Sequence, residues 1–591
     1  MTGAQRAYRK SWGAELVEGG VSFRLWAPSQ SRLTLRCDGQ DHPMTPEGDG
    51  WFVLTVPGIG AGAQYGFVLE DGRMVPDPAA RAQAGDVHGP SVVTDPRAFA
   101  WSPWQGRRWH EAVILELHVG TFTAEGTFRA AIEKLPHLVE TGITAIEIMP
   151  VAQFAGNRGW GYDGVLPYAP HTAYGSPDDL KALIDACHQH GLMVLLDVVY
   201  NHFGPEGSYL STYAPDFFNA GRHTPWGDAI AFTRDPVRQF FIENALYWME
   251  EFHLDGLRLD AVDHLYDTSD PEILVDIAQA VRARFPHAHL TTEDNRNITH
   301  LHQRDGEGRP QLYTAEWNDD FHNVAHVIAT HESEGYYTDF VEDRWTLFAR
   351  ALAQGFAWQG EVMPSSGVAH GEPSAHLPPL AFVDFLQNHD QIGNRAYGER
   401  LLALSSSDMV RALMTIHLLS PHVPLLFMGE EFGATQPFAF FTDFHGDQAE
   451  AVRGGRREEF ASFAAFRKKE MRRTIPDPND PATFAASRID WNQAASHAGR
   501  DWLAFTRGLL NLRRIWVMPH LAGAKGHAGQ VLMAEDGLVA VDWQLDGMRL
   551  QLRANLSNDS ADLPPATGTC FIGQPGALAA LHVAVWAEPS S

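Results

Sequence analysis

From about residue 110 to residue 518, short apolar runs alternate with segments whose apolar residues recur every three or four positions. The runs have the length of strands buried on both faces, and the periodic segments have the length of amphipathic helices. One helix is well marked, because Ser176 can cap its start, Asp179 can close a capping box and Gly191 can end it. Cys187 falls on the apolar face of this helix, so we expect it to pack in the core. The alternation predicts a parallel sheet covered by helices.

Eight apolar runs along this region have the character of buried strands. They are VILELHVG (113–120), AIEIMPV (145–151), LMVLLDVV (192–199), GLRLDAV (256–262), HLTTED (289–294), QLYTAEW (311–317), FVDFLQNHD (382–390) and PLLFMGEE (424–431). Eight parallel strands favour a closed (β/α)8 TIM barrel over residues 110–518, with a short insertion after the third strand. An open doubly wound sheet is the rival arrangement, although no glycine-rich phosphate fingerprint follows the early strands.

The two flanks of this region alternate apolar and polar residues as strands do. Residues 1–95, with runs such as VSFRLWAP separated by Gly, Pro and Asp, predict an N-terminal β-sandwich of the carbohydrate-binding type. Residues 520–591 return to the same alternation in GLVAVDWQL and MRLQLRANL. We therefore expect a small C-terminal β-domain, arranged as a second sandwich.

Composition restricts the classes of function. A chain of 591 residues should form about three or four domains, and its 73 acidic against 45 basic residues give a formal net charge of −28. Nucleic acid and anionic membranes would be repelled by this charge and are not expected as partners. Three scattered cysteines support neither a disulfide framework nor a zinc cluster, and we expect a cytoplasmic protein. The first residues, MTGAQRAYRKSWGAEL, lack the apolar core of a signal peptide, and no apolar run reaches membrane-spanning length.

The run DGLRLDAVDH, residues 255–264, carries the most informative polar residues. A strand alternates its faces, so Arg258 and Asp260 share one side of it. Two charges on the inner face of a buried strand are costly unless they pair, and a purely structural salt bridge is the competing interpretation. Other polar residues lie at the carboxyl ends of the predicted strands, where barrel enzymes have their active sites. They are Asn201, His202, His264, Glu293, His389 and Asp390.

Carboxylates at neighbouring strand ends suit glycosidic chemistry, which needs one ionised carboxylate and one protonated acid beside the scissile bond. Arg258 would favour the ionised form of Asp260 and keep it a nucleophile, while crowding by carboxylates could hold a proton on Glu293. Asp390 would then orient sugar hydroxyls and stabilise positive charge at the anomeric carbon.

Side chains of other types could bind the sugar. His202 and His389 offer hydrogen bonds to it. Tyr162 is the expected sugar platform among the loop aromatics, with Trp160 and Trp226 as candidates that could equally pack as lids or local cores.

Four segments in this order resemble the signature regions of the α-amylase superfamily, glycoside hydrolase family 13. They are DVVYNH (197–202), GLRLDAVDH (256–264), TTED (291–294) and QNHD (387–390). The resemblance implies that Asp260 is the nucleophile, Glu293 the general acid/base and Asp390 the transition-state stabiliser, in a reaction that retains anomeric configuration. It also implies that substrate is bound by Asp197, His202, Arg258, His264 and His389. FRLWAPS (23–29) is similar to the N-terminal β-sandwich of branching enzymes and isoamylases in this superfamily.

Other segments, above all YTAEWNDDFHNVAHV (313–327), resemble superfamily members that release trehalose from maltooligosyltrehalose by cleaving the adjoining α-1,4 bond. Asp319 and Asp320 are then expected contacts for the trehalose end, although a structural loop is an equal alternative. No cofactor or metal is implied, since the segment after the third strand is short for a calcium-binding insertion. The resemblance implies a companion enzyme that makes the trehalose-capped substrate, but not a complex with it. A glycogen branching or debranching enzyme is the main alternative, and a non-catalytic glucan-binding protein is another.

Overall fold

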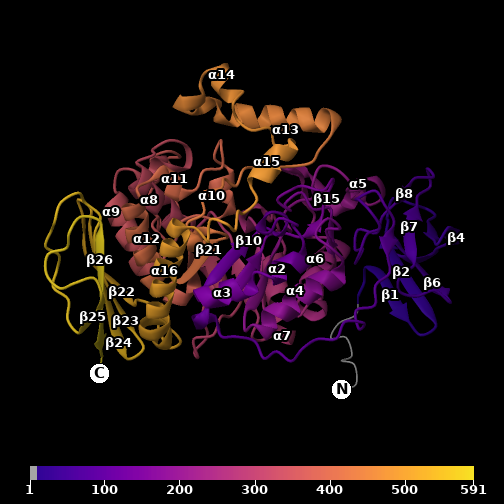
Figure 1. The fold of residues 1–591 in the computed structure, drawn as a ribbon. Coiled ribbons are helices and arrows are strands. Elements are labelled where there is room, and N and C mark those ends of the chain that lie inside the picture. Colours follow the sequence, from indigo (N-terminus) through magenta and orange to yellow (C-terminus); the bar gives the residue numbers. More distant parts are fainter. Residues whose placement is uncertain (1–9, 591) are drawn as a thin grey trace.

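The computed structural model describes residues 10–590. The first nine residues of the expected N-terminal sandwich, which also begin the segment considered as a leader, lie outside this range, as does Ser591. Figure 1 shows an elongated molecule with the N-terminal strands at one end, the C-terminal strands at the other and the barrel between them.

Eight parallel strands close into a barrel, which confirms the predicted fold class. They are β10 (Ile114–Leu117), β11 (Ala145–Ile148), β14 (Met193–Val198), β17 (Gly256–Leu259), β18 (His289–Thr292), β19 (Ala315–Trp317), β20 (Phe382–Asp384) and β21 (Val423–Phe427), in sequence order around the barrel. Seven of them lie within the predicted runs, and β21 begins one residue before its run. Pairing of β21 with β10 completes the ring, and Asp197 of β14 stands in register with Arg258 of β17.

Helices cover the outside of the barrel. They include α3 (Leu135–Thr141), α4 (Pro177–Gln189), α6 (Asp235–Glu251), α7 (Ile273–Arg284), α8 (Asp319–Thr330), α12 (Ser407–Leu419) and α16 (His497–Leu512). Between β18 and β19 the chain forms only a 3-10 turn, His300–His302. The capping box predicted for α4 is present: the Ser176 hydroxyl accepts from the Asp179 amide at 3.2 Å, and the Asp179 carboxylate accepts from the Ser176 amide at 2.9 Å. Cys187 is fully buried, as expected.

The N-terminal strands form two antiparallel sheets. One contains β1 (Gly13–Val17), β2 (Gly20–Trp26), β6 (Trp51–Pro57) and β5 (Thr45–Gly48), and the other contains β4 (Gln40–Pro43), β3 (Thr34–Cys37), β7 (Gln64–Val68), β8 (Met74–Val75) and β9 (Ser91–Val92). Phe23 of the first sheet meets Tyr65 of the second with ring centroids 4.9 Å apart. Trp12 attaches this sandwich to the barrel, because its ring packs on Phe240 of α6 and its indole N–H donates to the carbonyl of Pro236 at 3.0 Å.

The C-terminal strands form one antiparallel sheet, in the order β22 (Gly529–Glu535), β23 (Leu538–Leu545), β24 (Met548–Asn555), β26 (His582–Pro589) and β25 (Thr569–Ile572). We expected a two-sheet sandwich here. Instead the sheet packs against α9 (Arg344–Gln354) and α12, so helices of the barrel bury the face that a second sheet would have covered. The buried Trp543 of β23 donates to the carbonyl of Leu352 in α9 at 3.0 Å.

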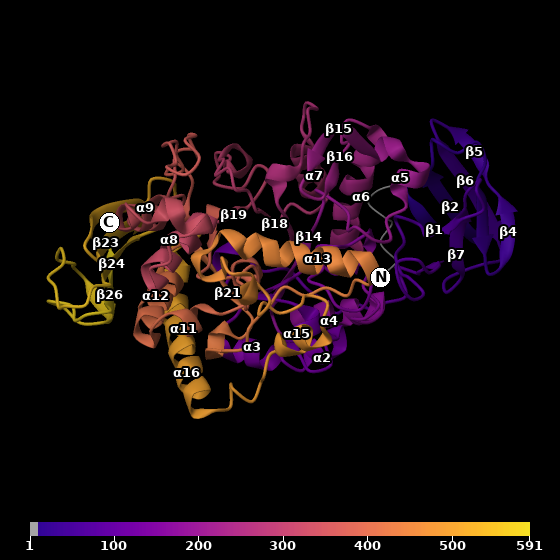
Figure 2. The same cartoon turned by 90° about the horizontal axis from the view of Figure 1, so that it is seen from above.

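Two excursions from the barrel lie near its open end. After β14 comes a hairpin of β15 (Phe218–Thr224) and β16 (Gly227–Ile230). After β21 comes an arm with α13 (Gly446–Glu459), α14 (Lys469–Arg472) and α15 (Pro481–Ala486). Helix α13 lies above the barrel in Figure 1 and across its middle when the molecule is seen from above in Figure 2. Within residues 10–590 no helix is both long and apolar enough to span a bilayer.

Candidate active site

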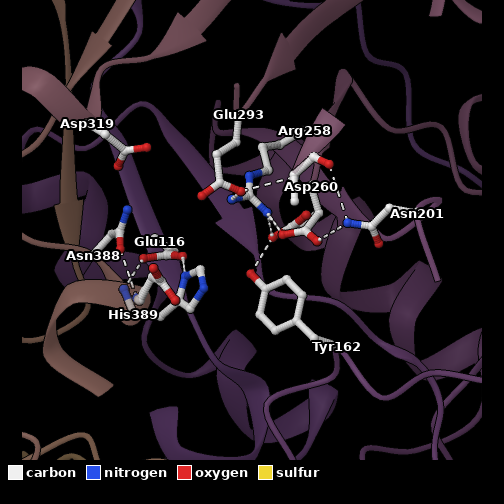
Figure 3. A network of polar contacts seen from close by, with 12 residues as sticks. Glu116, Tyr162, Asn201, Arg258, Asp260, Glu293, Asp319, Asn388 and His389 are labelled. Atoms are coloured by element: carbon white, nitrogen blue, oxygen red, sulfur yellow. Dashed lines mark hydrogen bonds and ion pairs between the residues drawn. The ribbon is translucent and has the colours of Figure 1, made fainter. Parts of the chain in front are cut away.

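A buried arginine joins three carboxylates at the ends of adjacent strands. Nη1 of Arg258 lies 2.6 Å from Asp197 and 2.9 Å from Asp260, and its Nη2 lies 2.6 Å from Oε2 of Glu293. Figure 3 shows the side chains of Asp260 and Glu293 converging on this guanidinium. The expectation that Arg258 and Asp260 share one face of the strand is met, and the pair is part of a larger cluster rather than an isolated salt bridge.

The backbone after β17 also forms a hydrogen bond with the cluster. Ala261 adopts a left-handed conformation with φ +40°, and its amide donates to Oε2 of Glu293 at 3.1 Å. Below the carboxylates, the guanidinium of Arg258 lies over the ring of Trp317, 4.1 Å from the centroid. Neither contact was anticipated, because Ala261 carries no polar side chain and Trp317 was placed only at the end of a predicted strand run. These contacts fix Arg258 and Glu293 in place.

Burial raises the pKa of both candidate catalytic carboxylates. It raises the pKa of Asp260 to about 6, while Arg258 acts in the opposite direction. It likewise raises the pKa of Glu293 to about 7, with Arg258 opposing and the charges of Asp260 and Asp390 adding to the rise. The crowding foreseen for Glu293 thus contributes, but loss of hydration is the larger cause. The order of the two values leaves Asp260 ionised and Glu293 partly protonated near neutrality.

Helix α10 (His389–Gly393) holds a histidine and an aspartate side by side at the end of β20. Asn388 caps this short helix, with its side-chain oxygen accepting from the Asp390 amide at 2.8 Å. The His389 ring forms a hydrogen bond with the carboxylate of Glu116 in β10. The same carboxylate accepts from the His389 amide at 3.0 Å. Burial lowers the pKa of His389, but the charge and the hydrogen bond of Glu116, together with the charge of Asp390, outweigh this effect and raise the pKa to about 9. His389 is therefore a cation at neutral pH.

Glu116 was missed in the sequence. The available signal was a carboxylate within the otherwise apolar strand run VILEL, where only a paired acid can be buried at acceptable cost.

Asp390 and Asp319 lie beside the cluster, and Asp320 does not. Asn394 donates to Asp390 at 2.6 Å, and Gln391 donates to Asp319 at 3.1 Å. Figure 3 shows Asp319 in the same group of side chains as Glu293. The pKa of Asp319 is raised well above its usual range by burial and by the charges of Glu293 and Asp390.

The carboxylate of Asp320 points elsewhere. It accepts from the Asn297 side chain at 2.8 Å and from the amides of Ala357 and Trp358 at 2.9 Å each. The expectation that Asp320 contacts substrate is replaced by a structural role, because successive residues at the start of α8 point in different directions.

Aromatic and histidine side chains surround the carboxylates. The Tyr162 hydroxyl donates to Asp197 at 2.6 Å, and its ring stacks on His389 with centroids 5.0 Å apart. His202 stacks on Trp226 at 4.4 Å, and Trp226 meets His264 edge to face at 5.1 Å. The ring of His202 also forms a hydrogen bond with the carbonyl of Tyr162, at 2.9 Å, so Tyr162, His202, His264 and His389 belong to one connected group.

Trp160, a candidate sugar platform, is a packing residue. It is buried, stacks on Phe438 with centroids 5.4 Å apart, and donates to the carbonyl of Ala439 at 3.1 Å. In residues 10–590 no three His, Cys, Asp or Glu side chains are grouped so as to hold a metal ion.

A closed parallel barrel with paired carboxylates around a buried arginine at its strand ends defines a glycosidase of the α-amylase class. The family model "Alpha amylase, catalytic domain" matches residues 93–219. The chain is 41% identical to a malto-oligosyltrehalose trehalohydrolase of Deinococcus radiodurans over 89% of this chain and 87% of the relative. It is 38% identical to one of Saccharolobus solfataricus over 85% and 87%. The chain belongs to the malto-oligosyltrehalose trehalohydrolase family, as the sequence motifs indicated.

A solved structure from Salmonella typhimurium, described provisionally as an α-amylase, shares 53% identity. It covers 98% of this chain and 100% of its own, with a TM-score of 0.95. The whole architecture, with both flanking β-regions, is therefore found in a second protein.

Proposed function

We propose that this protein hydrolyses the α-1,4 bond next to the terminal trehalose of maltooligosyltrehalose, releasing trehalose and a maltooligosaccharide with retained anomeric configuration. The observation that carries the chemistry is the cluster of Asp197, Asp260 and Glu293 on Arg258. The proposed substrate rests on membership of the trehalohydrolase family.

In the first step, Asp260 attacks the anomeric carbon and Glu293 gives its proton to the departing glycosidic oxygen. One bond forms between the sugar and Asp260, and the bond to trehalose breaks. Oε2 of Glu293 already accepts from Arg258 and Ala261, so Oε1 is the oxygen suited to carry the proton. Asp390 and the cationic His389 hold the sugar hydroxyls, and the carboxylate of Asp390 balances the positive charge that develops on the ring.

In the second step, Glu293 removes a proton from water, which attacks the anomeric carbon and releases Asp260. The enzyme returns to its first protonation state, and the two inversions give net retention. Tyr162 and Arg258 keep Asp197 in place beside the same sugar. Replacement of water by a sugar hydroxyl in this step would give a branching enzyme instead, with the same carboxylates.

The decisive experiment is incubation of the purified protein with maltotriosyltrehalose, without added metal, followed by chromatography of the sugars released. We expect free trehalose and maltotriose. An intact substrate, together with new branches formed on amylose in a parallel reaction, would establish the branching activity instead. Glu293→Gln serves as the control for contaminating hydrolases, and the anomer first formed can be assigned by proton NMR.

The substrate and the cysteines indicate where and beside which other enzyme the protein works. A second enzyme must supply the trehalose-capped glucan by converting the reducing end of a maltooligosaccharide. The three cysteines, Cys37, Cys187 and Cys570, are free thiols, which suits a reducing cytoplasm.

A further inference from the structure

Glu147 of β11 is an acid buried inside the barrel, with 1% of its surface exposed. Arg258 and His389 are the cations that hold the acids described above, Glu116, Asp197, Asp260 and Glu293. By contrast, no protein group within residues 10–590 forms a hydrogen bond with either carboxyl oxygen of Glu147. Burial of an unbonded carboxyl is costly, so the place of Glu147 in the barrel needs a physical explanation.

The side chain of Glu147 points into the barrel. Ala145, two residues earlier in β11, packs with Leu195 and Trp317 in the apolar cluster formed by the inner faces of the barrel strands. Ile146 and Ile148 belong instead to the larger core between the strands and the helices. Because side chains alternate along a strand, Glu147 shares the inner face with Ala145.

Strand register places Glu147 beside another acid. It is paired with Glu116 of β10 on one side and with Leu195 of β14 on the other, and Asp197 is two residues further along β14. Glu116 is held by the cationic ring of His389, whereas Glu147 has no such contact within the described residues. Like charges directly opposite each other on neighbouring strands are unfavourable. The arrangement therefore favours a proton on Glu147.

The charges around Glu147 act in the same direction. Burial raises its pKa well above the usual range, and the charges of Asp197, Glu116 and Glu293 raise it further, while Arg258 opposes them. These groups face Glu147 from β10, β14, β17 and β18. Glu147 is thus a neutral carboxylic acid at the pH where the carboxylates of the site work, and it has an O–H group to donate.

Other polar atoms of the barrel interior are also without a protein partner within residues 10–590. They are Oδ1 of Asp197, Nε of Arg258, Oγ1 of Thr291 and Nε1 of Trp317, all on buried side chains. These residues come from four strands that follow β11 in order around the barrel, β14, β17, β18 and β19. Buried polar groups of this kind bind ordered water, and this set offers both donors and acceptors to it.

We propose that Glu147 is a positioning residue, which keeps its proton through both steps of the reaction and donates, through water bound in the barrel interior, to Oδ1 of Asp197. The inference rests on the proposed function. Oδ2 of Asp197 already accepts from Tyr162 and Arg258 at 2.6 Å each, so a donor at Oδ1 fixes the direction of this carboxylate. A neutral acid also adds no negative charge beneath Arg258, which leaves the guanidinium to Asp260 and Glu293.

The test compares Glu147→Gln with Glu147→Leu, using maltotriosyltrehalose as substrate and circular dichroism to show that both variants are folded. Gln keeps a neutral side chain with an N–H donor, whereas Leu fills a similar volume and forms no hydrogen bond. We expect kcat/KM of Glu147→Gln to stay within about twofold of the wild type, and that of Glu147→Leu to fall about tenfold or more. Equal losses in the two variants would overturn the proposal, and so would full activity in Glu147→Leu.

The pH profile distinguishes a neutral Glu147 from an ionised one. Removal of a negative charge near Asp260 and Glu293 would lower the pKa of both and move both limbs of the profile to lower pH. We expect no such movement in Glu147→Gln, because the residue carries no charge to remove. Glu316→Gln is the matched control, since Glu316 is equally buried but lies between Ala315 and Trp317 and so points out of the barrel, to Thr292. A shift of both limbs in Glu147→Gln by about half a pH unit or more would refute the proposal.

Two measurements without turnover separate this inference from the proposed activity. An infrared difference spectrum between the wild type and Glu147→Gln, with 13C in the glutamate carboxyls, should show the C=O stretch of a protonated acid. A high-resolution crystal structure should show water bridging Glu147 and Oδ1 of Asp197. Carboxylate bands in the spectrum, or no water at this place, would refute the role of Glu147. Failure of the wild-type protein to cleave maltotriosyltrehalose would instead refute the activity, whatever these two measurements show.

Discussion

Nη2 of Arg258 lies 2.6 Å from Oε2 of Glu293, while Nη1 of the same guanidinium lies 2.9 Å from Asp260. The proposed acid and the proposed nucleophile therefore share one buried cation. Arg258 stabilises negative charge on either carboxylate, and ionisation of one disfavours ionisation of the other. A shared cation and a single shared proton suit a reaction in which Asp260 must be ionised while Glu293 is protonated.

Replacement of Glu293 by Gln should abolish turnover and leave binding largely intact. The amide has no proton to give to the leaving oxygen, and we expect kcat to fall by about 10³-fold or more with little change in affinity. Steady-state kinetics and calorimetry with maltotriosyltrehalose check this. Full activity in this variant would refute the assignment of Glu293 as the acid.

The rate should depend on pH as a narrow bell. Asp260 works in its ionised form, so kcat/KM should fall as pH drops through its pKa of about 6. Glu293 works in its protonated form, so kcat/KM should fall as pH rises through its pKa of about 7. The maximum is expected between these values, with both limbs belonging to the coupled pair. A flat profile from pH 5 to pH 8 would be incompatible with raised pKa values for Asp260 and Glu293.

The barrel and the cluster of carboxylates at its strand ends could be predicted because their signals are local. A buried parallel strand is a continuous apolar run, and a carboxylate at its end breaks that run visibly, as Asp260 does after GLRL. Ser176 and Asp179 likewise mark the start of α4 within four residues of sequence.

The features that could not be predicted depend on contacts between distant segments. Glu116 matters because His389 meets it across 273 positions of sequence. The direction of Asp320 is decided by the loop at Ala357, and the single C-terminal sheet by the helices that happen to cover it.

Asp260→Asn should prevent formation of a covalent sugar adduct. The amide is a poor nucleophile, so mass spectrometry of rapidly quenched reactions should find a glycosyl adduct in the wild-type protein and none in this variant. The double variant Asp260→Asn/Glu293→Gln is the matched control, because it lacks both groups. An adduct found on a residue other than Asp260 would overturn its assignment as the nucleophile.

Glu116→Gln should act through His389. Without the charge of Glu116, the pKa of His389 falls below its present value of about 9, and the ring loses its proton at a lower pH. We expect kcat/KM to drop about tenfold and KM to rise more steeply above neutrality than in the wild type.

A double-mutant comparison separates this positioning role from a general structural one. Glu116→Gln should add little to the loss caused by His389→Gln, because both changes remove the same cationic contact to the sugar. Additive losses would show instead that Glu116 acts independently of His389.

Asp320 and Asp319 should respond in opposite ways to substitution, although they are adjacent. Asp320→Ala removes the acceptor of three hydrogen bonds and leaves the amides of Ala357 and Trp358 unsatisfied. Each unsatisfied group costs about 1–3 kcal/mol, so urea unfolding should show a marked loss of stability with KM nearly unchanged at low temperature. Asp319→Ala should instead alter KM and leave the unfolding midpoint close to that of the wild type, because this carboxyl is half-buried and faces Glu293 and Asp390. Asp320→Asn, which keeps a side-chain oxygen, should recover part of the stability. A stable Asp320→Asn protein with a strongly raised KM would return Asp320 to the substrate-binding residues.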